Sequence, residues 1–244
     1  MAAMKAECFD LVEKMNPSEH HTVFSTTKRD YRDNYFINSA DRIGFFFEDG
    51  ALDENGQLQV DKHRSLNKIG HALHVLCPAF RRMTFSDKIK KLVRSLDYED
   101  PVVVQSMYIF KQPKIGGEVV PHQDGSFLYT EPLKVMGLWL ALEDATVDNG
   151  CLSFIPGSHK GGLINNLRMI RNKATDGPSC VFTAETPTYD QSKLVPVPVK
   201  KGSLIAINGL VVHQSETNTS DRSRHIYTFH LYDNKTAKWS DQNW

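Results

Sequence analysis

Residues 204–231 read LIAINGLVVHQSETNTSDRSRHIYTFHL, and this stretch decides the fold class. Its apolar residues predict three short strands separated by polar turns, at 204–207, 211–215 and 224–231. Because side chains alternate between the two faces of a strand, His213 shares one face with Val211 and Ser215. Arg224 lies on an apolar face of the strand that follows. The stretch therefore predicts a β fold in which polar side chains enter an apolar interior.

A second motif, His122-Gln123-Asp124, precedes His213 by eighty-nine residues. Two imidazoles and one carboxylate with no fourth protein ligand are typical of a facial triad, which holds Fe(II) and leaves the opposite side open. In an extended chain, residues two apart share a face, so His122 and Asp124 are predicted to point at one ion from a single strand. The motif is short, and a core histidine beside a surface carboxylate is the alternative interpretation.

Arg224 follows His213 by eleven residues, on a strand pattern where an arginine needs a buried anionic partner. A planar guanidinium is the usual clamp for a carboxylate. A cosubstrate with one metal-chelating end and one distant carboxylate would fit both groups, and 2-oxoglutarate has this shape. The pattern therefore predicts Fe(II) as the metal and 2-oxoglutarate as cosubstrate, with an open side for an oxidant.

The remaining pattern predicts helices in the first hundred residues and strands after them. One helix covers 4–15, and a second follows an N-cap at Ser86 and buries Ile89, Leu92, Val93 and Leu96. Further strands are predicted at 102–110, 134–142, 151–155 and 194–199. The segment 161–192 is polar and without periodicity, and we expect a functional or mobile loop there, with Arg168, Arg171 and Lys173 solvated. The length fits one domain, 1–244, with helices mainly in 1–100 and the β core mainly in 101–244.

Charge and cysteine content exclude some classes of function. Lys plus Arg and Asp plus Glu both number 29, so no long-range field favours nucleic acid or an anionic membrane. The four cysteines form no Cys-x-x-Cys pair, which favours reduced thiols. No signal peptide or membrane-spanning run is evident. We expect a cytoplasmic monomer that acts on a small molecule.

Several longer segments resemble the phytanoyl-CoA dioxygenase family of Fe(II)- and 2-oxoglutarate-dependent oxygenases. The matching segments span most of the chain, at 67–74, 105–113, 116–124, 149–159 and 220–224. The resemblance implies dioxygen as the oxidant and a double-stranded β-helix (jelly-roll or cupin-like) with buttressing N-terminal helices. It also implies a strand-and-helix segment before the first helix and more chain after the last strand. Loss of such a strand would expose a sheet edge.

The resemblance implies a role for each of eight residues. The iron ligands are His122, Asp124 and His213. The positions that surround 2-oxoglutarate are Lys68, Met107, Trp139, Ser215 and Arg224. Without the resemblance, Lys68 is interpreted as a solvated lysine on a helix-like stretch and Met107 and Trp139 as core residues. His71 and His74 are predicted to pack on a short helix, and His225 and His230 have no assigned role.

The predicted reaction is hydroxylation of a small-molecule or acyl-type substrate, with release of succinate and carbon dioxide. Phe110, Phe127 and Tyr129 are expected to form an apolar lining near the metal. Two other classes of function stay open. One is a cupin-type metal enzyme that catalyses hydrolysis or isomerisation, which the position of Arg224 disfavours. The other is a non-catalytic metal-binding barrel, which the complete triad disfavours.

Overall fold

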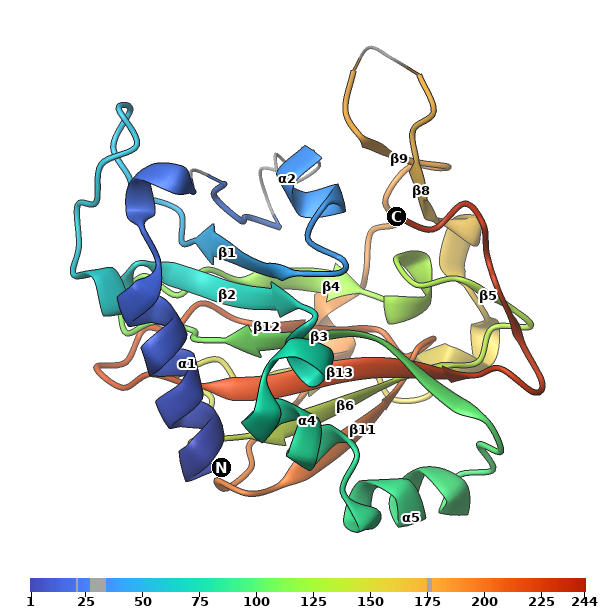
Figure 1. Cartoon of the computed structure of the whole chain (residues 1–244). Helices are drawn as coiled ribbons and strands as arrows, with labels where there is room; N and C mark the ends of the chain where they lie inside the picture. The colour runs from blue at the N-terminus through green and yellow to red at the C-terminus, as the bar shows by residue number, and fades with distance from the viewer. Residues whose placement is uncertain (21, 27–33, 175–176) are drawn as a thin grey trace.

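The computed structural model describes residues 1–20, 22–26, 34–174 and 177–244 (Figure 1). The α-helices of these residues are α1 (Ala2–Lys14), α2 (Asn34–Ile37), α3 (Leu73–Leu76), α4 (Pro78–Thr84) and α5 (Asp87–Ser95). The strands are β1 (Ile43–Phe47), β2 (Leu66–His71), β3 (Pro101–Ile109), β4 (Val119–His122), β5 (Thr130–Glu131), β6 (Val135–Ala141), β7 (Leu152–Phe154), β8 (Met169–Arg171), β9 (Cys180–Phe182), β10 (Val195–Val197), β11 (Leu204–Asn208), β12 (His213–Ser215), β13 (Ile226–Asp233) and β14 (Lys238–Trp239). The protein is mainly β, as predicted.

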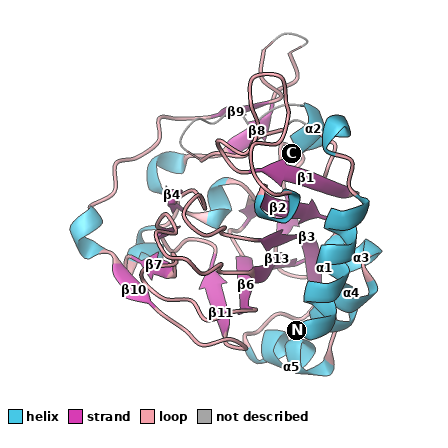
Figure 2. Cartoon of the chain, turned by 90° about the vertical axis from the view of Figure 1, so that its left-hand side faces the viewer, coloured by secondary structure: helices cyan, strands magenta, loops and turns pink. Residues whose placement is uncertain are grey.

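Two antiparallel sheets form the centre of the molecule. The larger sheet has six strands in the order β1-β2-β3-β13-β6-β11, and the smaller has four in the order β10-β7-β12-β4. In Figure 2 the helices α1, α3 and α4 flank one side of the six-stranded sheet, while β4, β7 and β10 lie on its other side. The larger sheet is therefore covered on both faces, which buries residues on both sides of its strands.

Alternation along β3, β6 and β13 separates two environments. Tyr108 and Tyr227 belong to the main hydrophobic core, which also contains residues of α1 and α4. Met107, Thr228 and Trp139 face the other way and are aligned across the three strands, Thr228 being paired with both others. This second face lines a cavity between the two sheets. The strand pattern thus places one row of side chains in the core and the next row at the cavity.

The two long predicted helices are present. α1 buries Met4, Cys8 and Val12, and α5 follows Ser86 and buries Ile89 and Val93. The Ser86 side chain makes no capping hydrogen bond, and Leu96, after the last helical residue, is 41% exposed. No helix in the described ranges is long and apolar enough to cross a membrane.

No individual strand was predicted before residue 102, but two strands lie there. β1 and β2 extend the six-stranded sheet, with Phe45 opposite Ile69 and Phe46 opposite Lys68. Lys68 and His71 therefore lie on a strand, whereas His74 lies in α3. Residues on both faces of these strands are buried, so the sequence shows no alternation of apolar and polar residues to signal a strand.

The described parts of the segment 161–192, residues 161–174 and 177–192, contain two strands that were not predicted. β8 and β9 form an antiparallel pair, with Met169 opposite Phe182. Both residues line the central cavity, as does Tyr189. Arg168 is not simply solvated, because its guanidinium stacks 3.7 Å from the centre of the Tyr129 ring. Described residues of this segment therefore form part of the cavity wall.

Two buried histidines outside the cavity lead to a prediction about acid stability. Burial lowers the pKa of His74 and of His225 to about 4, from an ordinary value near 6.5. Between these values the unfolded chain binds more protons than the folded protein, so stability falls as pH falls. We expect each histidine to remove about 2 kcal/mol from the free energy of unfolding between pH 7 and pH 5. Urea unfolding at both pH values, with a chelator present, measures the difference, and equal free energies would contradict this assignment.

Candidate active site

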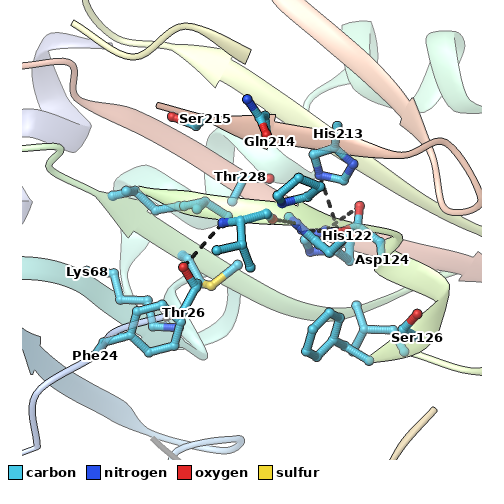
Figure 3. Close-up of a pocket in the computed structure, with 18 of the residues that line it drawn as sticks. Phe24, Thr26, Lys68, His122, Asp124, Ser126, His213, Gln214, Ser215 and Thr228 are labelled. Atoms are coloured by element: carbon cyan, nitrogen blue, oxygen red, sulfur yellow. Dashed lines mark hydrogen bonds and ion pairs between the residues drawn. The ribbon is translucent and has the colours of Figure 1, made fainter. Parts of the chain in front are cut away.

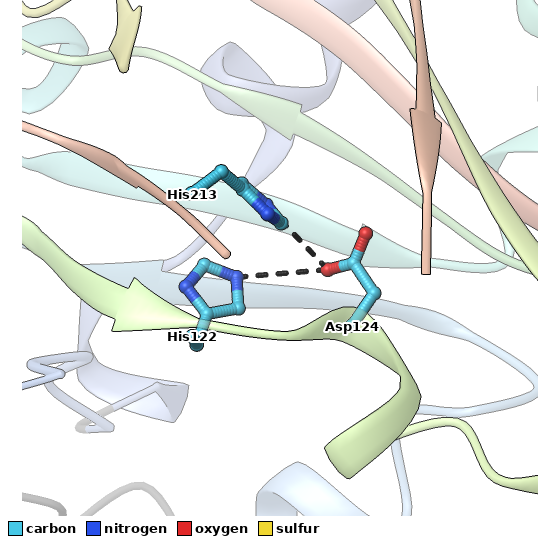
Figure 4. Close-up of side chains that lie close together, drawn as sticks. All are labelled: His122, Asp124 and His213. Atoms are coloured by element: carbon cyan, nitrogen blue, oxygen red, sulfur yellow. Dashed lines mark ion pairs between the residues drawn. The ribbon is translucent and has the colours of Figure 1, made fainter. Parts of the chain in front are cut away.

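The three predicted metal ligands come together at the cavity. His122 ends β4, and His213 begins β12 directly opposite it. Asp124 Oδ1 lies 3.6 Å from His122 Nε2 and 3.7 Å from His213 Nε2 (Figure 4). One potential ligand atom from each residue lies within 4.8 Å of the other two.

Asp124 reaches this cluster from a turn and not from the strand of His122. It begins a 3-10 turn, Asp124–Ser126. The amides of Ser126 and Phe127 donate to the carbonyls of Gln123 and Asp124, which ends the extended conformation after His122. The expectation of a single shared strand is therefore wrong, although the two side chains do converge.

Backbone carbonyls fix the orientation of both imidazoles. His122 Nδ1 lies 2.8 Å from the carbonyl of Val120, and His213 Nδ1 lies 3.1 Å from the carbonyl of Val211. A carbonyl can only accept, so in each ring the proton is on Nδ1. The Nε2 lone pairs are then free on the side facing Asp124. Metal-binding imidazoles are commonly held in this way.

The protonation states also suit a metal. Burial by itself would raise the pKa of Asp124, but the neighbouring histidines, His230 and His213 first, outweigh it and hold this pKa well below its usual value. Burial, together with the neighbouring His122, lowers the pKa of His213 to about 4. At neutral pH the carboxylate is ionised and the His213 ring is neutral, as ligation requires. Two nitrogens and one oxygen are a donor set that fits Fe(II).

Arg224 lies in the same cavity, where it is 2% exposed. Its Nη2 donates to Ser215 Oγ at 3.3 Å, whereas Nε and Nη1 have no hydrogen-bond partner among the described residues. The guanidinium lies 5.2 Å from the centre of the Trp139 ring, and burial lowers its pKa to about 10. A buried cation with two unused donors fits an anionic ligand.

Lys68 is buried, which contradicts its interpretation as a solvated lysine. It is 4% exposed and lines the cavity. Its ammonium lies 3.3 Å from the centre of the Phe24 ring, and Figure 3 shows the two side chains together beside the cavity. Burial holds the pKa of Lys68 well below its usual value. An anion near this amine would favour its charged form.

Met107, Trp139 and Ser215, the other predicted cosubstrate contacts, all line the cavity. The Ser215 hydroxyl donates to the carbonyl of Gly150 at 2.8 Å, which leaves its oxygen free to accept from Arg224. The structure thus brings all five predicted cosubstrate positions and the triad to one cavity of about 200 Å³.

Sequence reasoning missed two buried residues beside the triad. His230 Nε2 lies 3.2 Å from Asp124 Oδ2, and His230 Nδ1 lies 3.2 Å from the side-chain nitrogen of Gln105. The available signal was strand alternation, since His230 shares the cavity face with Thr228. His225 faces the opposite side, where its Nδ1 lies 2.8 Å from the hydroxyl of Tyr108.

Sequence reasoning also missed Lys111. Its ammonium donates to the carbonyl of Gly117 at 2.6 Å and to that of Ser215 at 3.3 Å. These contacts connect the chain just before β4 to the end of β12. Because each of these strands carries one histidine of the triad, Lys111 helps to fix their spacing.

The predicted apolar lining is only partly correct. Phe127 lines the cavity, and its ring meets that of His122 at 5.8 Å. Phe110 belongs to the core on the other face of the sheet, and Tyr129 lies beside Arg168. The wider apolar lining comes from residues distant in sequence, among them Leu152, Leu167, Met169, Phe182, Ile207 and Trp244.

Solved structures share the fold of this chain. The match to the crystal structure of EvdMO1 covers 96% of this chain and 44% of the EvdMO1 chain, with a TM-score of 0.58 and 23% identity. EctD from S. alaskensis, crystallised with 2-oxoglutarate and 5-hydroxyectoine, covers 91% of this chain and 82% of its own, with a TM-score of 0.54 and 16% identity. At these identities the comparison supports the fold alone.

Relatives at higher identity show the family. The model of the phytanoyl-CoA dioxygenase family matches residues 2–226. Phytanoyl-CoA dioxygenase domain-containing protein 1 of Bos taurus is 52% identical over 249 residues, covering 99% of this chain and 85% of the relative. The homologue of that protein in Caenorhabditis briggsae is 54% identical, covering 96% of this chain and 83% of the relative. A phytanoyl-CoA dioxygenase of Arabidopsis thaliana is 50% identical, covering 91% of this chain and 77% of the relative. The chain belongs to the phytanoyl-CoA dioxygenase family.

Proposed function

We propose that this protein is an Fe(II)- and 2-oxoglutarate-dependent dioxygenase that hydroxylates a small-molecule or acyl-type substrate. The observation that carries the proposal is one cavity that holds both the His122, Asp124 and His213 cluster and the partly unpaired Arg224 guanidinium. A metal chelate and a distant carboxylate would satisfy both groups at once. Membership of a dioxygenase family supports the same activity.

We further propose that residues 1–244 form one domain built on a double-stranded β-helix. Two antiparallel sheets with a cavity between them support this architecture. The helices on the outer face of the larger sheet then act as the buttress. A rigid sheet beneath the cavity would hold the site residues in position.

Each site residue has a role in this proposal. His122, Asp124 and His213 would hold Fe(II), which together with the cosubstrate and dioxygen supplies the oxidising power for hydroxylation and releases succinate and carbon dioxide. Arg224 and Ser215, with Lys68, would bind the distant carboxylate of 2-oxoglutarate. Met107 and Trp139 would form the walls that orient it. Burial of these groups excludes water, which strengthens each charge-assisted contact.

The lining of the cavity supports a substrate with an apolar part. Phe127 contacts the ring of His122, and the ring of Phe154 stacks at 5.8 Å on that of His213. The name of the Arabidopsis relative points to an acyl thioester for that protein, and an acyl chain is one apolar group that such a lining would accept.

Anaerobic titration of the metal-free protein with Fe(II) and 2-oxoglutarate, followed by a succinate assay in air, tests the proposed activity. We expect a visible charge-transfer absorption that requires both additions, and succinate release after air is admitted. Metal binding without the absorption or succinate would favour a cupin-type hydrolase or isomerase, or a barrel without turnover. Metal binding that gives neither the absorption nor succinate would therefore overturn the proposal.

A further inference from the structure

Three buried side chains contact one another in series, namely Asp124, His230 and Gln105. His230 contacts Oδ2 of Asp124, whereas the two triad histidines lie near Oδ1. His230 on β13 is paired with Gln105 on β3 and with Gly137 on β6. The Gln105 side-chain nitrogen lies 3.2 Å from His230 Nδ1, and His230 Nε2 lies 3.2 Å from Asp124 Oδ2. Gln105 is 8% exposed, His230 6% and Asp124 7%, so water does not compete freely for these atoms.

The partners of His230 fix the direction of its proton. An amide nitrogen can only donate, so His230 Nδ1 accepts from Gln105 and the ring proton lies on Nε2, facing Asp124. His230 Nε2 lies 3.2 Å from Asp124 Oδ2 without the geometry of a hydrogen bond, and this oxygen has no hydrogen-bond partner within the described part of the chain. His122 and His213 have the reverse arrangement, with Nδ1 protonated and Nε2 free. His122 and His213 therefore each have an Nε2 lone pair near Asp124, whereas His230 has an Nε2–H there.

The two oxygens of the carboxylate consequently have different surroundings. Oδ1 lies near the Nε2 atoms of both triad histidines, and Oδ2 lies near Nε2 of His230. A carboxylate that used both oxygens on one metal would occupy a further coordination position. The proposed chemistry would need that position free for the cosubstrate or the oxidant.

Gly137 provides the space for this contact. A Cβ atom at residue 137 would lie 3.2 Å from Asp124 Oδ2 and 3.2 Å from His230 Nε2. Any side chain there would press against both partners. The absence of a side chain at this position lets the histidine and the carboxylate meet.

We propose that Gln105 and His230 are positioning residues that hold Asp124 to one metal-binding oxygen and keep an adjacent coordination position open. Gln105 sets the tautomer of His230, and the Nε2–H of His230 is then the polar group next to Asp124 Oδ2. This inference rests on the proposed metal site and assigns roles to two residues that do not contact the metal. Outer partners of metal ligands commonly change metal affinity by roughly 10- to 100-fold.

Anaerobic metal titrations of four variants test the inference without relying on turnover. His230→Leu removes the donor at similar bulk, and we expect metal affinity to fall at least about tenfold. We also expect the visible spectrum of the Co(II)-loaded protein to change, because the number of ligand atoms changes. His230→Gln restores an N–H donor at a similar reach, and its affinity should stay within about threefold of the unmodified protein. Gln105→Leu, which keeps His230 but removes its fixed tautomer, should give an intermediate loss.

His225→Leu is the matched control. His225 is also a buried histidine and directly precedes β13, but it faces Tyr108 and not the cavity. Its replacement should leave the affinity and the Co(II) spectrum unchanged, with circular dichroism reporting the fold of every variant. Unchanged affinity and spectrum in His230→Leu would overturn the inference, and so would equal losses in His230→Leu and His230→Gln, which would indicate packing. Failure of the unmodified protein to bind metal would instead overturn the proposed function.

Discussion

Replacing His213 with alanine is expected to abolish iron retention and succinate formation while the fold is kept. His213 contributes one of three ligand atoms, and the remaining imidazole and carboxylate cannot hold a divalent ion against water. We expect metal affinity to fall by at least about a hundredfold. The fold should survive because β12 is held by backbone pairing to both β4 and β7, which does not involve the imidazole. His122→Ala should behave in the same way.

Iron content after anaerobic loading and desalting, together with a succinate assay and circular dichroism, measures this effect. His159→Ala is the control, because His159 is an exposed histidine outside the cavity. We expect that variant to retain iron like the unmodified protein. Normal turnover in His213→Ala would show that the metal site lies elsewhere.

Replacing Arg224 with methionine is expected to lower the apparent affinity for 2-oxoglutarate by more than about tenfold. The substitution keeps length and apolar bulk but removes the charged donors Nε and Nη1, which have no partner within the described residues. Leaving a carboxylate unpaired in a largely buried pocket costs on the order of 2–5 kcal/mol. Iron binding should survive, because a guanidinium has no lone pair to offer a metal.

The same variant should have a distinctive effect on stability. In the ligand-free protein, Arg224 is a buried cation with unused donors, so methionine should leave the melting temperature unchanged or raise it. The rise in melting temperature that 2-oxoglutarate gives the iron-loaded protein should be lost. Arg222→Met is the matched control, because Arg222 is 65% exposed and pairs with Asp148 at 3.4 Å. Normal 2-oxoglutarate binding by Arg224→Met would refute the cosubstrate role, and loss of iron would indicate that Arg224 is structural.

Much of the fold was predictable because the relevant strands and helices have local signals. The alternation in 224–231 predicted β13, and the spacing of Met4, Cys8 and Val12 predicted α1. β1 and β2 were missed because residues on both of their faces are buried, which removes the alternation. The β8 and β9 pair was missed because three-residue strands are too short to show a period.

The sequence by itself determined which residue types stand on which strand face. Alternation placed Ser215 beside His213, and the resemblance to the phytanoyl-CoA dioxygenase family selected Lys68 against its local appearance. Only the tertiary structure decided what each face meets. It directed His230 to Asp124 and His225 to Tyr108, although both residues lie in one predicted strand. The physical reason is that periodicity depends only on neighbours along the chain. The contacts of His230 with Gln105 and with Asp124 instead join residues more than a hundred positions apart, which meet only in the folded protein.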